Sequence, residues 1–265
     1  MSTSAGLAAA WREALESWAI PDEILAAAPA PPWVHPPQMF RLVDEESAPE
    51  TPSFRQARAA LGSGGTVLDV GCGGGRSSLP LGEVVTHLTG VDESGAMLAQ
   101  FMEAAAARGI PAAVVQGLWP AVAVSVGVVD LVVCHHVAYN VADIVPFIEA
   151  LTAHARRRVV VELTARHPQT ALNPLWQRFW GIERPVEPSS RLFADIVRAL
   201  GYEPEVDHEV RTPRRSNLDR SASVAFVRQR LCLPADRDPE VEAALGADPR
   251  HGVDDYTTVS WVPVA

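Results

Sequence analysis

The chain has 265 residues, 48% of them hydrophobic, and a formal net charge of −10 at pH 7. This length can bury the core of one α/β domain with elaborations, and the acidic balance argues against a general nucleic-acid binder, which needs a basic face. No stretch approaches the ~18 apolar residues of a membrane span, no signal peptide is recognisable, and three scattered cysteines fit a reducing compartment. We therefore expect a cytoplasmic protein with no membrane or nucleic-acid partner.

The first 60 residues are predicted to form an N-terminal helical cap. Leu and Trp recur at helical spacing within residues 5–28, which indicates two short helices. A proline-rich, extended connector follows at 29–37, and residues 52–61 are expected to form the helix that leads into the core.

Strands and helices then alternate with short links. The predicted strands cover residues 66–70, 86–92, 112–116, 128–134 and 157–163. The predicted helices between them cover about 76–83, 94–108 and 143–154. Alternation of this kind predicts a parallel sheet that is covered by helices on both faces.

The second half of the chain is less regular. Helices are predicted at about 174–180, 188–200, 220–230 and 238–245, and strands at about 203–210 and 256–262. Neither an internal repeat nor a low-complexity linker divides this part of the sequence. We therefore expect one domain over residues 61–265, with an insertion at about 211–250.

The segment TVLDVGCGGGRSS, residues 66–78, joins an apolar strand, a glycine turn and the start of a helix. This combination binds nucleotide-like cofactors at the carboxyl end of the strand, and glycine allows the backbone to turn sharply and approach the ligand. Asp92 ends the next predicted strand about 20 residues later, a spacing that suits a carboxylate accepting hydrogen bonds from ribose hydroxyls.

A nicotinamide-dependent oxidoreductase is the rival interpretation of this turn. It would follow the pattern GxGxxG, whose third glycine would fall at Arg76. The chain instead has Gly71, Gly73 and Gly75 at GxGxG spacing, with Asp69 inside the preceding strand. Both departures disfavour a nicotinamide cofactor.

The pair VLDVGCGGG and GVDES, the latter followed by Met97-Leu98, resembles motif I and the next acidic motif of class I S-adenosylmethionine (SAM)-dependent methyltransferases. Phrases such as VVCHHVAYNV extend the likeness along the chain and are similar to actinobacterial members. The resemblance implies a Rossmann-like α/β fold with a mostly parallel seven-stranded sheet in the order 3-2-1-4-5-7-6. It also implies SAM as cofactor and S-adenosylhomocysteine as product.

The resemblance assigns cofactor contacts residue by residue. Asp69 would accept hydrogen bonds from amides of the turn or from the cofactor's amino group, and Gly71 and Gly73 would let the backbone approach it. Asp92 would bind the ribose hydroxyls, and Met97 would pack on the adenine ring. The full set of predicted cofactor-binding residues is Asp69, Gly71, Cys72, Gly73, Asp92, Glu93, Met97, Gly117, Leu118, Trp119 and Cys134.

Relatives commonly carry an acidic residue near position 117, where it accepts from the adenine amino group. This chain has Gly117, Leu118 and Trp119 there instead. We therefore expect backbone atoms around Leu118 to contact the adenine edge. Trp119 either supplies stacking area or belongs to the core, and both interpretations stay open.

The end of the fourth predicted strand would face the cofactor's methyl group in this fold. The predicted catalytic residues there are His135, His136 and Tyr139. A histidine could act as a general base, because its reference pKa lies near working pH, or it could only shape the pocket by hydrogen bonding. Adjacent strand residues point to opposite faces and no second His/Cys pair follows, so we expect no metal site.

These features predict the transfer of a methyl group from SAM to a small-molecule acceptor by direct in-line displacement. Such a reaction needs alignment and exclusion of water more than covalent catalysis, so the lack of a catalytic triad is no objection. A SAM- or nucleoside-binding module without catalysis is the alternative. The motifs identify a cofactor but leave open the acceptor and the oligomeric state, for which a homodimer is one option.

Overall fold

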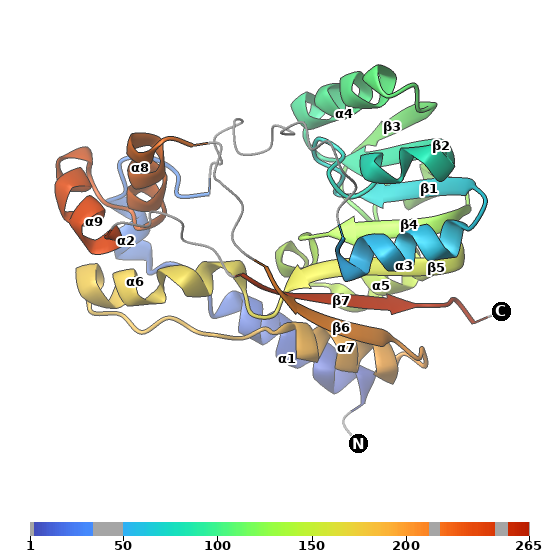
Figure 1. Cartoon of the computed structure of the whole chain (residues 1–265). Helices are drawn as coiled ribbons and strands as arrows, with labels where there is room; N and C mark the ends of the chain where they lie inside the picture. The colour runs from blue at the N-terminus through green and yellow to red at the C-terminus, as the bar shows by residue number, and fades with distance from the viewer. Residues whose placement is uncertain (1–2, 34–49, 212–217, 247–253, 265) are drawn as a thin grey trace.

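The computed structural model of the chain describes residues 3–33, 50–211, 218–246 and 254–264. A seven-stranded sheet with helices on both faces lies beside a smaller group of helices (Figure 1). The parallel strands point towards this second group, so their carboxyl ends face it (Figure 1).

The sheet has the strand order β3-β2-β1-β4-β5-β7-β6. Its strands are β1 (Gly65–Val70), β2 (Val85–Asp92), β3 (Ala112–Gln116), β4 (Val129–His135), β5 (Ala155–Thr164), β6 (Glu205–Val210) and β7 (Asp255–Trp261). The first five strands pair in parallel, and β7 is antiparallel to both β5 and β6. This order confirms the predicted fold class.

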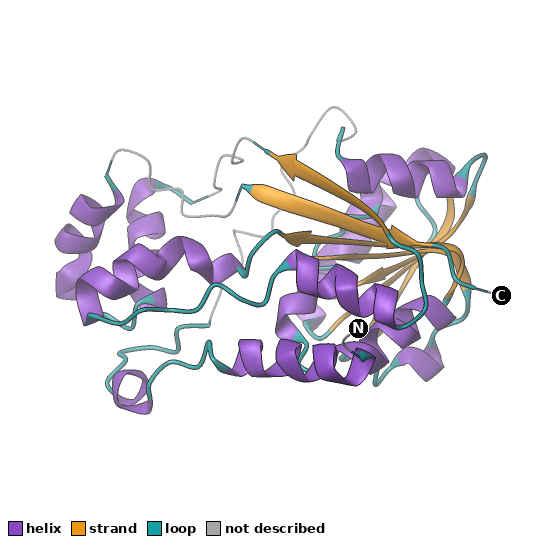
Figure 2. Ribbon diagram, turned by 90° about the horizontal axis from the view of Figure 1, so that it is seen from below, coloured by secondary structure: helices purple, strands orange, loops and turns teal. Residues whose placement is uncertain are grey.

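Helices cover the two faces of the sheet separately. The helices of the described chain are α1 (Ser4–Glu16), α2 (Asp22–Ala26), α3 (Pro52–Leu61), α4 (Gly95–Ala107), α5 (Ile144–Ala153), α6 (Asn173–Trp180), α7 (Ser190–Ala199), α8 (Arg220–Arg230) and α9 (Asp238–Leu245). On one face α3 and α4 bury Leu61 and Phe101 against alternate strand residues such as Val133. On the other face α1, α5 and α7 bury their apolar side chains against the intervening residues. Figure 2 shows helices on both sides of the sheet. Both faces are therefore dry, as the continuous apolar strands predict.

The short helix predicted after the glycine turn is a 3-10 helix that begins three residues later, at Leu79, and ends at Val84. Residues 76–78 are turn instead, because the hydroxyls of Ser77 and Ser78 bond to the buried Asp69 carboxylate. The helix proper then starts with Pro80 in its first turn, where the missing N–H costs nothing.

The helical lobe consists of α2, α6, α8 and α9, which pack around a third apolar cluster. Ile24, Trp176, Val227 and Val241 each contribute a buried side chain from one of these helices. The lobe thus combines a segment from the predicted cap with the segments that follow β5 and β6. No helix of the described chain is long and apolar enough to cross a bilayer.

The predicted N-terminal cap is distributed over three places. Helix α1 packs on α7 and α5, α2 joins the helical lobe, and α3 lies on the sheet against β5. Part of the connector lies outside the described residues. The division of the chain at residue 60 stays a prediction.

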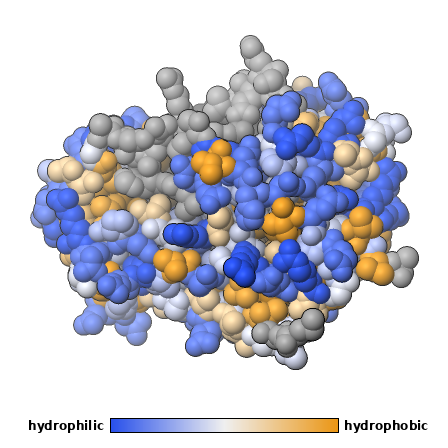
Figure 3. Space-filling model, turned by 60° about the horizontal axis from the view of Figure 1, so that its bottom comes forward, coloured by the Kyte–Doolittle hydropathy of each residue, from blue (hydrophilic) through white to orange (hydrophobic). Residues whose placement is uncertain are grey.

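The face of the molecule in Figure 3 is largely hydrophilic. On the face shown in Figure 3, the described hydrophobic residues lie in small patches that hydrophilic residues separate. Scattered exposed apolar residues of this kind are ordinary for a folded surface and indicate no particular site.

Trp11 anchors α1 to the sheet domain. Its side chain is fully buried, its Nε1 donates to the Val141 carbonyl at 2.8 Å, and its ring stacks on Tyr139 with centroids 5.6 Å apart. The indole therefore contributes both apolar burial and a satisfied buried donor.

Replacing Trp11 with Ala should lower the free energy of unfolding by about 3–5 kcal/mol, because it leaves a large cavity and an unpaired carbonyl. Urea denaturation followed by far-ultraviolet circular dichroism measures this loss. Trp33→Ala is the matched control, since the Trp33 side chain is half exposed. Equal losses in the two variants would contradict the anchoring role of Trp11.

Candidate active site

The glycine turn leaves β1 with three residues in the left-handed backbone region. The φ angles are +69° at Gly71, +49° at Gly73 and +89° at Gly75. A Cβ at Gly71 would lie 2.2 Å from a methyl of Val137, and one at Gly75 would lie 2.5 Å from Leu79. A Cβ at Gly73 would meet no atom within 4 Å. Two of the glycines therefore serve close packing, and the third presents its backbone to open space.

The Asp92 carboxylate ties this turn to the end of β2. One oxygen accepts from the Gly73 amide at 2.9 Å, and the other accepts from the Ser94 amide at 2.9 Å. Ser94 in turn caps α4, because its hydroxyl accepts from the Met97 amide. Each carboxylate oxygen keeps a second acceptor site for a ligand. Asp92 thus holds the turn and still fits the predicted ribose contact.

Asp69 lies buried beneath the turn. One of its oxygens accepts from the hydroxyls of Ser77 at 2.7 Å and Ser78 at 2.5 Å, and the other is buried without a hydrogen-bond partner. Burial raises the pKa of the carboxyl to about 6, although both hydroxyls act to lower it. Of the two expected kinds of donor, amides of the turn or the cofactor's amino group, serine hydroxyls stand in place of the amides. The second oxygen is an unused acceptor.

The thiols predicted to bind the cofactor lie in the core. Cys72 belongs to the cluster beneath α4, and Cys134 belongs to the cluster on the opposite face. Burial raises the pKa of both thiols, so neither is a ready nucleophile. This placement leaves the predicted contacts of these two residues to their backbone atoms.

The ends of β2 and β3 bring the remaining predicted cofactor residues together. Gly117 donates its amide to the Asp92 carbonyl at 2.9 Å, and the Glu93 carbonyl accepts from Gln116. The side chain of Glu93 is exposed, Met97 is partly exposed, and the following Leu118 is 63% exposed. Leu118 is therefore an apolar surface beside Asp92, where an adenine ring could pack.

Trp119 is part of the core. Its side chain is 8% exposed and packs edge-on against His154, with ring centroids 4.9 Å apart. Its Nε1 is buried without a hydrogen-bond partner. Of the two open interpretations, this burial favours packing over stacking on a cofactor.

Two histidines end β4 in different environments. The Nε2 atom of His135 is buried without a partner, and burial lowers the pKa of this ring to about 4. His136 has a left-handed backbone (φ +62°), and its side chain is 45% exposed. Its amide donates to the Glu162 carbonyl at 2.8 Å, and its Nε2 lies 3.3 Å from Glu162 Oε1. At neutral pH His135 is therefore a neutral, enclosed ring, whereas His136 reaches solvent.

Tyr139 packs in the core, an environment that disfavours its predicted catalytic role. Its hydroxyl donates to the Thr164 carbonyl at 2.7 Å, and its ring lies between Trp11 and His167. Burial raises the pKa of the phenol well above its usual range. A buried hydroxyl that is committed to the backbone cannot exchange protons with a substrate.

Sequence reasoning missed Glu162 and Arg211. Glu162 lies next to His135 in the β4–β5 register and is almost fully buried. Arg211 binds it with two hydrogen bonds of 3.0 and 2.6 Å, and Ser53 donates to it at 2.5 Å. Burial acts to raise the pKa of the Glu162 carboxyl, but His135, His136 and Arg211 together hold it well below its usual range. The one signal in the sequence was a lone acid inside the apolar run VVVEL.

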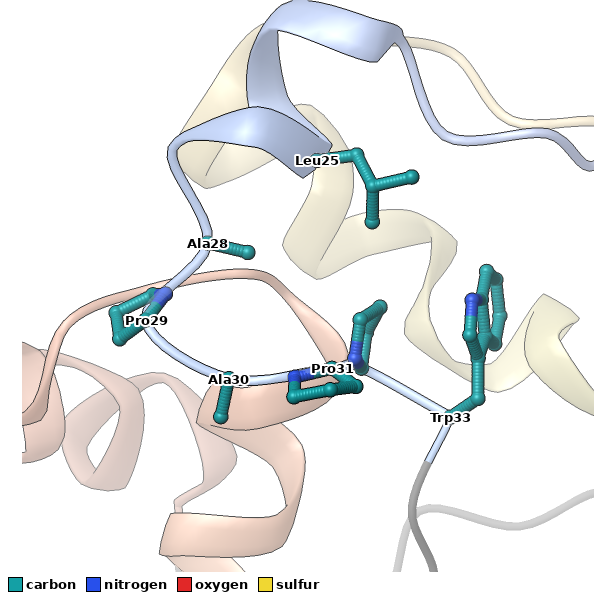
Figure 4. Close-up of a pocket in the computed structure, with 7 residues that line it drawn as sticks. Leu25, Ala28, Pro29, Ala30, Pro31 and Trp33 are labelled. Carbon is teal, nitrogen blue, oxygen red and sulfur yellow. The ribbon is translucent and has the colours of Figure 1, made fainter.

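Two other features carry no acid–base chemistry. A pocket of about 410 Å³ beside α2 is lined only by apolar side chains, among them Leu25 and Trp33 (Figure 4). Within the described residues, no group of three or more His, Cys, Asp or Glu side chains is arranged to hold a metal ion.

Asp69→Asn should remove one contribution to the pH dependence of stability. The unfolded carboxyl ionises near its ordinary pKa of 3.8 and the folded one near 6, so between these values the folded chain binds more protons. Stability contributed by this group therefore falls as pH rises through that window and levels off above it. As pH rises from 3.5 to 7, the free energy of unfolding of the variant minus that of the wild type should increase by up to about 3 kcal/mol.

Urea denaturation at several pH values measures this effect. Asp236→Asn, in the exposed 3-10 helix Ala235–Arg237, controls for the loss of one negative charge. Parallel stability curves for the wild type and Asp69→Asn would show that the Asp69 carboxyl does not carry the raised pKa.

Comparisons with known proteins agree with this geometry. Residues 67–158 match the family model of the methyltransferase domain, whereas no curated protein sequence matches the chain. The crystal structure of the YcgJ protein from Bacillus subtilis has 16% identity and a TM-score of 0.55, covering 80% of this chain and 98% of that one. A SAM-dependent methyltransferase from Geobacter sulfurreducens, in complex with S-adenosyl-L-homocysteine, has 16% identity and a TM-score of 0.54, covering 86% and 97%.

Magnesium protoporphyrin IX methyltransferase from Synechocystis, with bound S-adenosylhomocysteine, has 16% identity and a TM-score of 0.50, covering 80% of this chain and 79% of that one. At such identities the solved structures show a shared fold. The actinobacterial likeness, the cytoplasmic location and the homodimer stay predictions. The family match and the strand order agree: residues 67–158 carry a methyltransferase domain, and the sheet that contains them has the class I methyltransferase fold.

Proposed function

We propose that the chain transfers the methyl group of SAM to a small-molecule acceptor. The observation that carries the proposal is the turn at the carboxyl end of β1, where Asp92 fixes the Gly73 amide and open space lies over Gly73. Ligands of this fold class bind outside the carboxyl ends of the strands, at the point where the strand order reverses, which here lies between β1 and β4.

The residues around the turn fit the three parts of SAM, which are the ribose, the adenine and the amino-acid part. The free acceptor sites of Asp92 suit ribose hydroxyls, and the exposed Leu118 suits an apolar base. The partnerless oxygen of Asp69 suits a cationic amino group, since an unused buried acceptor is costly unless a donor meets it. We therefore assign these three residues to the ribose, the adenine and the amino-acid part.

The bound cofactor supplies a methyl group that is already activated by the sulfonium. The chain has to align an acceptor with that group and exclude water, and neither task needs a covalent intermediate. The helical lobe faces the carboxyl ends of the strands, so it is placed to contribute to both tasks (Figure 1).

A small molecule is the acceptor class that the observations favour. The net charge of −10 suits neither a nucleic acid nor an acidic surface. The Synechocystis relative of this fold is described as a magnesium protoporphyrin IX methyltransferase, which names a small-molecule acceptor for that protein. Both points support the proposal without selecting one acceptor.

Isothermal titration calorimetry of the full chain with SAM tests cofactor binding, and Asp92→Ala should weaken it by about 1–3 kcal/mol. The variant loses a charge-assisted acceptor and releases the Gly73 amide. Glu103→Ala, an exposed acid on α4, is the control and should bind as the wild type does. A folded wild type that binds no SAM would end the proposal, and binding without turnover on any acceptor would favour a sensing module.

A second pair of variants tests the open space over Gly73. Gly73 and Gly109 share a left-handed backbone, and an added Cβ meets no atom within 4 Å at either position. Alanine at either position should therefore cost a similar ~1 kcal/mol of stability. Only Gly73→Ala should lower SAM affinity, by about tenfold or more, because its methyl group would fill the cofactor's place. Equal SAM affinities for the two variants would place the cofactor elsewhere.

A further inference from the structure

The carboxyl ends of β4 and β5 carry a polar cluster that the cofactor assignment does not use. It consists of His136, Glu162, Arg211, Ser53 and Tyr256, from β4, β5, β6, α3 and β7 or the segments next to them. The buried Glu162 lies at its centre and accepts hydrogen bonds from Ser53 and Arg211. Removing a carboxylate from water costs free energy even when it has this many partners. Because such groups are concentrated at functional sites, we consider a function for this one.

His136 is held on this carboxylate in one orientation. Its Nε2 faces Glu162 Oε1 at 3.3 Å, its backbone amide is bonded to the Glu162 carbonyl, and its ring meets the Tyr256 ring at an angle of 71°. When Nε2 carries the proton and donates it to Glu162, Nδ1 keeps the lone pair of the neutral ring. The ring is 45% exposed, so that lone pair can be reached from outside.

Arg211 anchors the carboxylate that faces the His136 ring. Arg211 bonds to both Glu162 and Glu209, and its guanidinium lies over the Tyr256 ring at 4.5 Å. Two carboxylates and one guanidinium leave one net negative charge next to His136. The neighbouring His135 is neutral at working pH, because burial lowers its pKa to about 4.

The cluster lies directly beside the glycine turn. Val137, the residue after His136, packs so closely on the turn that a Cβ at Gly71 would lie 2.2 Å from its methyl group. His136 itself has φ +62°, a left-handed backbone that is strained for a residue with a Cβ. Such strain is concentrated at functional sites, and here it turns the ring off the line of β4 towards Glu162.

We propose that His136 is the general base for methyl transfer, that Glu162 is the positioning residue that fixes its tautomer, and that the acceptor atom therefore carries a proton. The inference rests on the proposed function and narrows its substrate class to neutral O–H or N–H nucleophiles. The acceptor's lone pair forms the new bond to the methyl carbon, and the electrons of the broken sulfur–methyl bond stay on sulfur. The acceptor's proton passes to Nδ1 of His136. Neither His135, whose ring is enclosed, nor Tyr139, whose hydroxyl is bonded to Thr164, can take this role.

The tautomer of His136 is measurable without any acceptor. Long-range ¹H–¹⁵N correlation spectra of the full chain distinguish a protonated Nε2 from a protonated Nδ1, and the signals that disappear in His136→Gln assign the ring. We expect the neutral ring at pH 8 to carry its proton on Nε2. A neutral ring with its proton on Nδ1 would overturn the proposal, whether or not the chain binds SAM.

Turnover is measured as S-adenosylhomocysteine formed with 4-methylphenol, benzylamine or benzoate as probe acceptors. We expect product from the phenol or the amine and none from benzoate, which is already ionised and needs no base. His136→Gln should lose about 100-fold in turnover with SAM affinity unchanged, and added imidazole should restore part of the activity of His136→Gly. Glu162→Gln should lose turnover in the same direction, and the exposed His87→Gln on β2 is the matched control.

The outcomes separate the two proposals. No SAM binding by the wild type would end the proposed function, while the tautomer would still report on the His136–Glu162 pair. Turnover of His136→Gln equal to the wild type, or product from benzoate alone, would overturn the role of His136 and leave the methyltransferase assignment intact. If no probe is turned over, the tautomer decides.

Discussion

The Asp92 carboxylate is the interaction on which the cofactor side of the structure depends. It bonds the Gly73 amide from the turn after β1 and the Ser94 amide at the start of α4, so one side chain joins two βα units. Without it, both amides would need other partners at the rim of the sheet, where an unpaired N–H is costly. Glycine adopts the left-handed backbone of the turn without the penalty of a Cβ, and the bond from Gly73 to Asp92 adds to the turn's own bonds, such as that from the Gly75 amide to the Cys72 carbonyl.

A second constraint governs the other side of the site, and it is a buried charge rather than a backbone turn. Glu162 is charged within an apolar strand because Arg211, Ser53 and His136 converge on it from three other elements. Replacing such an arrangement by apolar residues often costs no stability, so stability alone gives it no reason to exist. The pairing of β7 between β5 and β6 brings Arg211 to Glu162, so the antiparallel end of the sheet shapes this cluster.

The sequence could predict the features that local sequence patterns determine. The strands, the glycine turn and Asp92 follow from apolar runs and from a fixed spacing, and the structure has them within a residue or two. Glu162 and Arg211 are 49 positions apart, and nothing local in either segment indicates that they meet. For Tyr139 too, a contact between distant segments decides the environment. Its position after β4 predicts a catalytic residue, but Trp11 of α1, far away in the chain, packs on its ring. The helical lobe could not be predicted from local patterns either, because α2 packs against α6, α8 and α9, which lie far from it in the sequence.

The cofactor half of the site depends on contacts close in sequence, and the other half depends on contacts between distant segments. The two halves therefore differ in how they tolerate substitutions. The cofactor half is encoded within one βαβ unit, so a substitution there acts on its immediate neighbours, and few substitutions keep the turn intact. The acceptor half is assembled from segments that β7, α3 and the helical lobe bring together, and each segment can vary while the turn stays the same. If His136 is the general base as proposed, the choice of acceptor depends on residues such as Glu162, Arg211 and those of the lobe, which no short sequence motif indicates. A search for the acceptor should accordingly begin from the chemistry of that cluster and not from the glycine motif.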